Sequence, residues 1–271
     1  MSSYTSDLRG VPIIDDSNYH QYAGDAVVDG HGMSRGFSVR DYNKNPEGFY
    51  APRFDVPLIP RSEWTDRIED LERKKATLCD IHDHYDIPVL DQNGNGYCWC
   101  FGLVKAMMVS RAINGLPPVF LSAASAAAKI KNGRDEGGWA GEAIEGIENY
   151  GVSDVKFWPE DSRDIRKYDT PEQRANAELH KVAEFVELPQ NNFDAVVTSL
   201  LMGWPTTLGL MWWGHLICGL TPRVIGRNEF GIEIVNSWKK SWGKNGRSVL
   251  TESKATPHEA IAVRSVSASR F

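Results

Sequence analysis

Gln92-Asn93-Gly94-Asn95-Gly96-Tyr97-Cys98-Trp99 is the stretch that decides the fold of this 271-residue chain. A polar, glycine-rich loop leads directly into Cys98, which opens an apolar stretch predicted to be helical as far as Gly115. A helix N-terminus suits a thiol nucleophile because the helix dipole stabilises the thiolate. Gln92, six residues before Cys98, carries a side-chain amide that can donate to a developing oxyanion, together with the backbone N–H of the cysteine. The stretch therefore predicts a nucleophile with an oxyanion site beside it.

Two residues far along the chain complete a set with Cys98. His215 follows Cys98 by 117 residues and Asn236 follows it by 138. An imidazole can take the thiol proton as general base and return it to a leaving amine as general acid. An asparagine that accepts from the other ring N–H holds the imidazole in place. We therefore predict Cys98, His215 and Asn236 as catalytic residues, with Gln92 as the oxyanion donor.

The segment around Asn236 resembles a known family. Asn236-Ser237-Trp238-Lys239-Lys240-Ser241-Trp242-Gly243-Lys244-Asn245-Gly246 is similar, without a gap, to the Asn-Ser-Trp-x-x-x-Trp-Gly-x-x-Gly block of the papain-like cysteine peptidases of the C1 type. In that family His and Asn follow the nucleophile by roughly 130–150 residues. Gly137-Gly138-Trp139 is similar to the Gly-Gly segment that lines the family's substrate cleft. The landmarks together cover about residues 85–265.

The resemblance implies a fold, an activity and binding residues. The implied fold is α+β, with a helical lobe and an antiparallel β-barrel-like lobe facing each other across a cleft. The implied activity is peptide hydrolysis, with a peptide or protein substrate and no metal or organic cofactor. Substrate contacts are expected at Gly137, Gly138, Trp139 and Trp238, and Trp238 is also expected to pack over the His215–Asn236 hydrogen bond.

Departures from the family pattern predict a divergent bacterial or phage-like member. Asn95 and Asp135 stand where the family usually has the two cysteines of a disulfide. The four cysteines at positions 79, 98, 100 and 218 are too scattered for a disulfide framework. Tyr97 replaces the usual small residue before the nucleophile, where its ring could narrow or cap the site.

The order of the elements supports the α+β class. Helical patterns come first and strand patterns follow after Pro205, which favours two unlike lobes. We expect an extended N-terminal arm with a short helix at residues 1–75 and a papain-like domain at residues 76–271. Within that domain the helical lobe is expected at about residues 76–150 and the β lobe at about residues 151–265. A helix from Thr170 to about Glu187 is also predicted, since Thr170-Pro171-Glu172-Gln173 forms a capping box.

Composition excludes several classes of function. The net charge of −6 argues against a nucleic-acid-binding protein. The first residues have neither the basic start nor the apolar run of a secretory signal, and no stretch approaches the length of a membrane span. We therefore expect a cytoplasmic protein without membrane contacts. Incorporation into a virion or another assembly is the second expectation.

Residues 1–60 leave the function open in one respect. They contain too few apolar residues for a core of their own, so their order must come from packing on another surface. An inhibitory propeptide would lie through the cleft, whereas an arm for protein partners or self-assembly would not; the second option is favoured here. Accordingly, the alternative to a peptidase is a papain-fold assembly component of a larger particle, with weak or no activity.

Two further alternatives concern other residues. A transferase or an inactive peptide-binding relative is a third possibility, and the bulky Tyr97 beside Cys98 is the feature that favours it. A metal site at His82 and His84 is a further alternative, weakened by the lack of a second ligand cluster.

Overall fold

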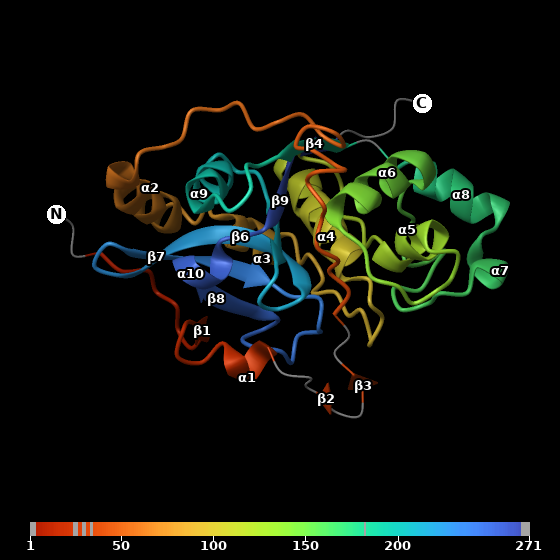
Figure 1. Cartoon of the computed structure of the whole chain (residues 1–271), viewed down its shortest axis with the longest axis horizontal. Helices are drawn as coiled ribbons and strands as arrows, with labels where there is room; N and C mark the ends of the chain where they lie inside the picture. The colour runs from red at the N-terminus through yellow and green to blue at the C-terminus, as the bar shows by residue number, and fades with distance from the viewer. Residues whose placement is uncertain (1–3, 24–26, 29–30, 33–34, 182, 267–271) are drawn as a thin grey trace.

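The computed structural model describes residues 4–23, 27–28, 31–32, 35–181 and 183–266. It has a mixed α+β architecture in which a sheet with its own helices lies beside a group of helices (Figure 1). The long helix α4 (Cys98–Ile113) runs between the two groups and packs against the sheet strand β6 (His215–Gly226). The predicted α+β class with two unlike lobes is confirmed.

A seven-stranded sheet forms the centre of the β lobe. Its strand order is β1-β8-β7-β6-β5-β9-β4. All neighbouring pairs are antiparallel except β1 with β8. Besides β6, the strands are β1 (Ile13–Ile14), β4 (Ala183–Glu187), β5 (Thr206–Leu210), β7 (Glu229–Val235), β8 (Arg247–Thr251) and β9 (Glu259–Val266). A separate antiparallel pair consists of β2 (Val27–Val28) and β3 (His31–Gly32).

The helices fall into two groups. One group lies around the sheet, and the other builds the second lobe. Near the sheet lie α1 (His20–Ala23), α2 (Arg61–Arg73), α3 (Leu78–His84), α9 (Phe193–Leu201) and α10 (Glu252–Ala255) (Figure 1). The second lobe contains α5 (Ala123–Ile130), α6 (Ala140–Tyr150), α7 (Ile165–Tyr168) and α8 (Pro171–Glu178) beside α4. Because α4 is covered from both lobes, every residue from Cys98 to Ala112 is buried. The nucleophile candidate therefore begins the most enclosed helix of the protein.

The predicted helix from Thr170 to Glu187 is wrong in its second half. The helix begins as expected, with Pro171 in its first turn and the Thr170 hydroxyl accepting from the Gln173 N–H, but it ends at Glu178. Residues 183–187 instead form β4, which pairs antiparallel with β9. Phe185, Val186 and Glu187 are buried there. Pairing with a strand more than 70 residues away overrides the local helical preference.

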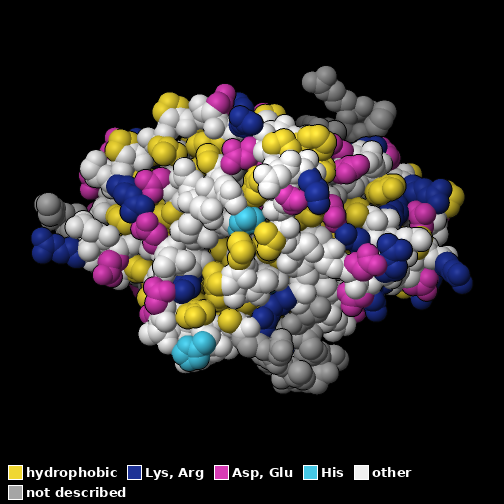
Figure 2. Space-filling model, in the orientation of Figure 1, with side chains coloured by type: hydrophobic (Ala, Val, Ile, Leu, Met, Phe, Trp, Pro, Cys, Tyr) yellow, Lys and Arg dark blue, Asp and Glu magenta, His cyan; other side chains and the backbone are white. Residues whose placement is uncertain are grey.

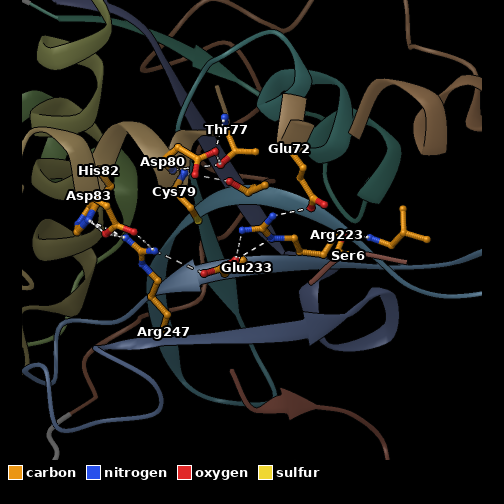
Figure 3. Close-up of polar contacts among 12 residues, drawn as sticks. Ser6, Glu72, Thr77, Cys79, Asp80, His82, Asp83, Arg223, Glu233 and Arg247 are labelled. Carbon is orange, nitrogen blue, oxygen red and sulfur yellow. Dashed lines mark hydrogen bonds and ion pairs between the residues drawn. The ribbon is translucent and has the colours of Figure 1, made fainter. Parts of the chain in front are cut away.

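Ion pairs join the helices α2 and α3 to the sheet (Figure 3); their arginines are largely buried, whereas Asp83 of α3 is exposed. The Arg223 guanidinium donates to Glu233 at 2.7 Å within the sheet and also pairs with Glu72 of α2. Arg247 pairs with Asp83 of α3, and it lies 3.7 Å from the other carboxylate oxygen of Glu233. Removing one member of such a group leaves a buried charge without compensation. This network fixes the segment that follows the N-terminal arm against the strands.

The described residues of the N-terminal arm pack on the chain's own lobes. Residues 13–14 add β1 to the edge of the sheet beside β8. Arg53 forms a parallel bridge with Glu187 at the opposite edge. Between them, the orange segment in Figure 1 rises between the sheet and the helices of the second lobe. Residues 1–3, 24–26, 29–30 and 33–34 of the predicted arm lie outside the described residues.

The surface charge in Figure 2 and the helix lengths concern two classes of partner, nucleic acids and membranes. Lys and Arg side chains are interspersed with Asp and Glu over this face, so its described part shows no extended basic patch (Figure 2). Among the described residues, no helix is long and apolar enough to cross a membrane.

Candidate active site

Cys98 lies in the first turn of α4 and is fully buried. Its sulfur accepts a hydrogen bond from the backbone N–H of Gly36 at 3.2 Å, across 62 residues of sequence. The backbone N–H groups of Leu216, Gly36, Trp99 and Cys98 itself also stabilise the thiolate form. Leu216 directly follows His215, so the sulfur lies at the start of β6. Cys100 lies two residues further along α4 and points toward α5, where its sulfur is 3.4 Å from the Ala123 carbonyl oxygen.

His215 is held by Asn236 and an aromatic cage. His215 begins β6, and its Nε2 lies 2.8 Å from Oδ1 of Asn236, which follows the end of the adjacent strand β7. Trp238 stacks on the imidazole, with ring centroids 4.5 Å apart and planes at 23°. Trp213 approaches the same ring edge-on at 5.2 Å. The other ring nitrogen, Nδ1, is buried and has no hydrogen-bond partner within the described part of the chain. Asn236 thus orients a ring whose second nitrogen is available for proton transfer.

Gln92 is fixed in the loop that leads to Cys98. Its Nε2 donates to the Asn95 carbonyl oxygen at 2.6 Å, and its Oε1 accepts from the Ser237 hydroxyl at 2.6 Å. The Gln92 N–H also donates to the Ser237 carbonyl oxygen at 2.9 Å. Ser237 follows Asn236, so one short segment supports both the glutamine and the imidazole. The loop residue is therefore rigidly positioned.

The expected cleft residues are in contact with the chain's own N-terminal arm. Residues 35–40, here named the strap, pass between Cys98 and the Gly137–Gly138 segment. Gly138 donates to the Gly36 carbonyl oxygen at 2.8 Å and accepts from the Ser38 N–H at 2.8 Å. These two bonds make a parallel β-bridge between Phe37 and Gly138. The strap therefore pairs with the glycine segment as an extended peptide would.

Gly36 is required by the closeness of this passage. A Cβ atom there would lie 1.8 Å from the Gly96 carbonyl oxygen. Gly137 faces it from the other side, where a Cβ would lie 2.7 Å from the Gly36 carbonyl oxygen. Only glycine backbone fits between these walls. Phe37, which follows, is 8% exposed, and its ring tip covers Gly209 of β5.

Arg40 anchors the far end of the strap. Its buried guanidinium pairs with Glu187 at the end of β4, and it donates to the Asn45 and Pro46 carbonyl oxygens. The same group lies over the Trp139 ring, 5.1 Å from the centroid. Trp139 is 8% exposed, so this expected substrate contact is occupied from within the chain.

Burial keeps both candidate catalytic groups neutral. It raises the pKa of Cys98 to about 11, against the lowering effect of the surrounding backbone N–H groups. Burial also lowers the pKa of His215 to about 4, although the Asn236 hydrogen bond acts in the opposite direction. A thiolate–imidazolium pair is therefore disfavoured in this buried arrangement.

Other sequence expectations have definite locations. The Tyr97 ring is buried beside Trp99, and its hydroxyl donates to the Arg134 carbonyl oxygen at 2.7 Å. Asp135 accepts from the N–H of Gly96 at 2.7 Å, so it contacts the residue that follows Asn95, the other position expected to lack a cysteine. His82 is buried between Lys105 and Arg247. Among the described residues, no group of three or more His, Cys, Asp or Glu side chains could hold a metal ion.

Sequence reasoning missed the strap and the carboxylates beneath it. Gly36, Phe37 and Arg40 have no motif of their own, and their contacts appear only when distant segments come together. Glu187 fell within the wrongly predicted helix. Glu259 begins β9 and is 1% exposed. The sequence offered one signal for Glu259. The apolar strand pattern begins at the next residue, so a charged residue stands at the start of a buried strand.

Comparison with solved structures gives the fold but not a close relative. No protein-family model matches the sequence, and no curated protein matches it. Xylellain, a cysteine protease from Xylella fastidiosa, is similar with a TM-score of 0.58 and 15% identity, over 89% of this chain and 100% of that one. Digestive procathepsin L 3 from the larval midgut of Tenebrio molitor gives 0.56 and 14%, over 65% and 66%.

A third similar structure is the proform of Amb a 11, a ragweed pollen cysteine protease, with a TM-score of 0.55 and 15% identity. It covers 80% of this chain and 69% of that one. Identities this low carry the architecture and not the chemistry. The chain has the fold of the papain-like cysteine proteases.

Proposed function

We propose that this chain is a cysteine peptidase with Cys98 as nucleophile, and that its own strap holds it latent. The observation that carries the proposal is the position of the strap backbone. Gly36 donates to the Cys98 sulfur while its neighbours pair with Gly138. An extended peptide segment already lies in front of the thiol, which is where a substrate would have to bind.

The residues around the sulfur support a reaction through a thioester. His215 Nδ1 would take the thiol proton while the sulfur forms a bond to the substrate carbonyl carbon. The carbonyl oxygen gains the negative charge and is stabilised by the Cys98 backbone N–H and the Gln92 side chain. The imidazolium then protonates the leaving amine as the C–N bond breaks. Water, deprotonated by His215, hydrolyses the thioester and restores the thiol.

Asn236 and Trp238 are proposed as positioning residues for the imidazole. The Nε2–Oδ1 contact of 2.8 Å leaves Nδ1 as the ring nitrogen that would take the thiol proton. Trp238 excludes water from that bond by stacking on the ring, and a dry hydrogen bond is stronger than a solvated one.

The strap supports latency for a geometric and an electrostatic reason. It fills the space at the thiol, and its parallel pairing with Gly138 is stabilised at Arg40 by a buried ion pair. It also removes water from Cys98 and His215, which disfavours their charged forms. Release of the strap would admit both substrate and water. The propeptide-like alternative, in which the arm passes by Cys98, Gly138 and Trp139, is supported by the contacts of Gly36, Ser38 and Arg40 with these residues.

The proposal is tested by hydrolysis of an unfolded protein substrate. We expect little activity from the wild-type chain and clear activity from Gly36→Ala, in which the strap cannot keep its place. Adding Cys98→Ala to that variant should abolish activity, whereas adding Cys100→Ala, a matched buried cysteine in the same helix, should not. Equal activity of the two double variants would reject Cys98 as the nucleophile.

A further inference from the structure

Arg111 carries a buried positive charge that no carboxylate neutralises. It lies in the last turn of α4 and is 5% exposed. Its Nη2 donates to the Pro117 carbonyl oxygen at 3.3 Å, whereas its Nε and Nη1 are buried and have no hydrogen-bond partner within the described part of the chain. Burial lowers the pKa of this guanidinium, and no carboxylate of the described residues acts against that effect. Because an arginine keeps its proton in proteins, the charge remains and needs an acceptor.

His180 brings a second nitrogen without a partner to the same place. It lies two residues beyond the end of α8 and is 7% exposed. Its Nδ1 is buried and makes no hydrogen bond to any described residue. Burial lowers the pKa of this imidazole to about 4, and the positive charge of Arg111 acts in the same direction. The two side chains are therefore near enough to influence each other, although no hydrogen bond joins them.

The surrounding chain holds the ends of α4 and α8 together. The segment that follows α4 forms an antiparallel bridge from Leu121 to Asp154. The Asp154 N–H donates to the Asn176 side chain of α8 at 2.8 Å, so both helices are tied to the same short segment. The Asp154 carboxylate accepts from the Lys156 N–H at 2.9 Å and lies 3.7 Å from the Lys156 Nζ. It is thus engaged elsewhere and does not neutralise the guanidinium.

The two nitrogen-bearing groups lie directly beneath the surface. Ile113, two residues beyond Arg111, is 40% exposed, and Leu179, next to His180, is 46% exposed. Each neighbours a turn that follows a helix end. A small ion therefore has a short path to the site that leaves the helices intact. Arg111 is about 20 Å from Cys98 along the axis of α4, so the site is separate from the cleft.

We propose that Arg111 and His180 form a binding site for a free tetrahedral oxyanion of the phosphate or sulfate type, which links the end of α4 to the end of α8. Two guanidinium donors and an imidazole nitrogen without partners match the several acceptor oxygens of such an ion. Hydrogen bonds between a charged donor and an oxyanion are about twice as strong as neutral ones. A water molecule would accept from the guanidinium but leave its charge uncompensated, which is costly in a buried place. The near-complete burial of both side chains favours a small free ion over a larger ligand.

Thermal unfolding of the full chain tests this site without catalysis. An ion that binds only the folded state raises Tm as its concentration rises. At constant ionic strength, replacing chloride by about 20 mM phosphate should raise Tm by about 2–4 °C for a Kd near about 1 mM. Arg111→Met should remove this shift, and in chloride its Tm should be no lower than that of the wild type, because a buried charge is gone. Arg174→Met is the matched control on α8, since Arg174 is exposed and pairs with Asp169; it should keep the shift.

A second measurement locates the ion. Crystals soaked in selenate, a tetrahedral oxyanion with a strong anomalous signal, should show a selenium peak between Arg111 and His180. His180→Gln should at least halve the phosphate shift, which keeps the site testable if Arg111→Met folds poorly. A full shift in Arg111→Met, an equal shift from acetate, or selenate bound only elsewhere would overturn the proposal.

Discussion

The structure makes its clearest prediction for Gly36→Ala, which should displace the strap from Cys98. The new methyl carbon would lie 1.8 Å from the Gly96 carbonyl oxygen and 2.5 Å from its carbon. Both are backbone atoms of the loop before Cys98, and Gly137 closes the opposite side. The methyl group cannot turn away, so the strap has to move outward. Its hydrogen bonds to the Cys98 sulfur and to Gly138 must then lengthen or break.

The size of the effect follows from the cost of overpacking. Forcing a methyl group into a filled space costs about 1–3 kcal/mol. That cost falls on the closed state alone, because the strap is unconstrained once it leaves. A free-energy difference of this size changes a population by about 5- to 150-fold. We therefore expect Cys98 to become accessible about 5- to 150-fold more often in the variant.

Alkylation of Cys98 by iodoacetamide measures this population directly. When the strap closes faster than the reagent reacts, the labelling rate is proportional to the open fraction. Val39→Ala is the matched control, because Val39 is in the strap but 52% exposed. It should leave the rate within about twofold. An unchanged labelling rate in a folded Gly36→Ala variant would refute the claim that the strap closes the site. So would equal acceleration by Val39→Ala.

Three further predictions concern the imidazole, the buried carboxyl and the ion-pair network. Asn236→Ala should lower kcat/KM of the Gly36→Ala variant about ten- to hundredfold, because losing the buried acceptor of the imidazole N–H costs about 1–3 kcal/mol; an unchanged kcat/KM would contradict its positioning role. Burial raises the pKa of the Glu259 carboxyl in the folded state to about 8, well above its ordinary value of 4.5. Its contribution to stability is therefore lost as pH rises between these values, by about 1.4 kcal/mol per pH unit, and denaturant unfolding of Glu259→Gln should show a flatter pH profile. Glu233→Ala should lower the free energy of unfolding by about 1.5–3 kcal/mol, because the largely buried Arg223 guanidinium loses one of its two carboxylate partners and keeps only Glu72. The exposed pair at Glu63 offers the control, where Glu63→Ala should cost less than about 1 kcal/mol in the same denaturant titration.

Local patterns in the sequence predicted the elements that local forces decide. The helix at Cys98 was expected to extend to Gly115 and ends at Ile113, and strands were expected after Pro205, where β5 begins at Thr206. The strand β4 could not be found in this way. It is specified by pairing with β9 and by the arm that covers its edge, both distant in sequence. The capping box at Thr170 correctly predicted where the helix begins, but it carried no information about where the helix ends.

The candidate site divides in the same way. Motif spacing named Cys98, His215 and Asn236, and the structure brings Asn236 to the imidazole and the Cys98 sulfur to the backbone beside His215. Nothing in the spacing predicts that Gly36 donates to that sulfur, because the contact depends on how the arm wraps the finished fold. The expectation that the arm serves docking or assembly stays a prediction, and the contacts of residues 35–40 with the cleft are an addition that the sequence did not indicate. Close packing between two distant backbone segments produces no periodic pattern in the sequence, so it could not be predicted from one.

The central claim is that Cys98 forms a covalent thioester once the strap is displaced. Its most direct test is the mass of the Gly36→Ala variant after brief incubation with a peptide ester and acid quenching. We predict a single added acyl group that maps to the Cys98 peptide and is absent when Cys98→Ala is added. An acyl group on any other residue, or none during measurable ester turnover, would contradict the assignment of Cys98 as the nucleophile.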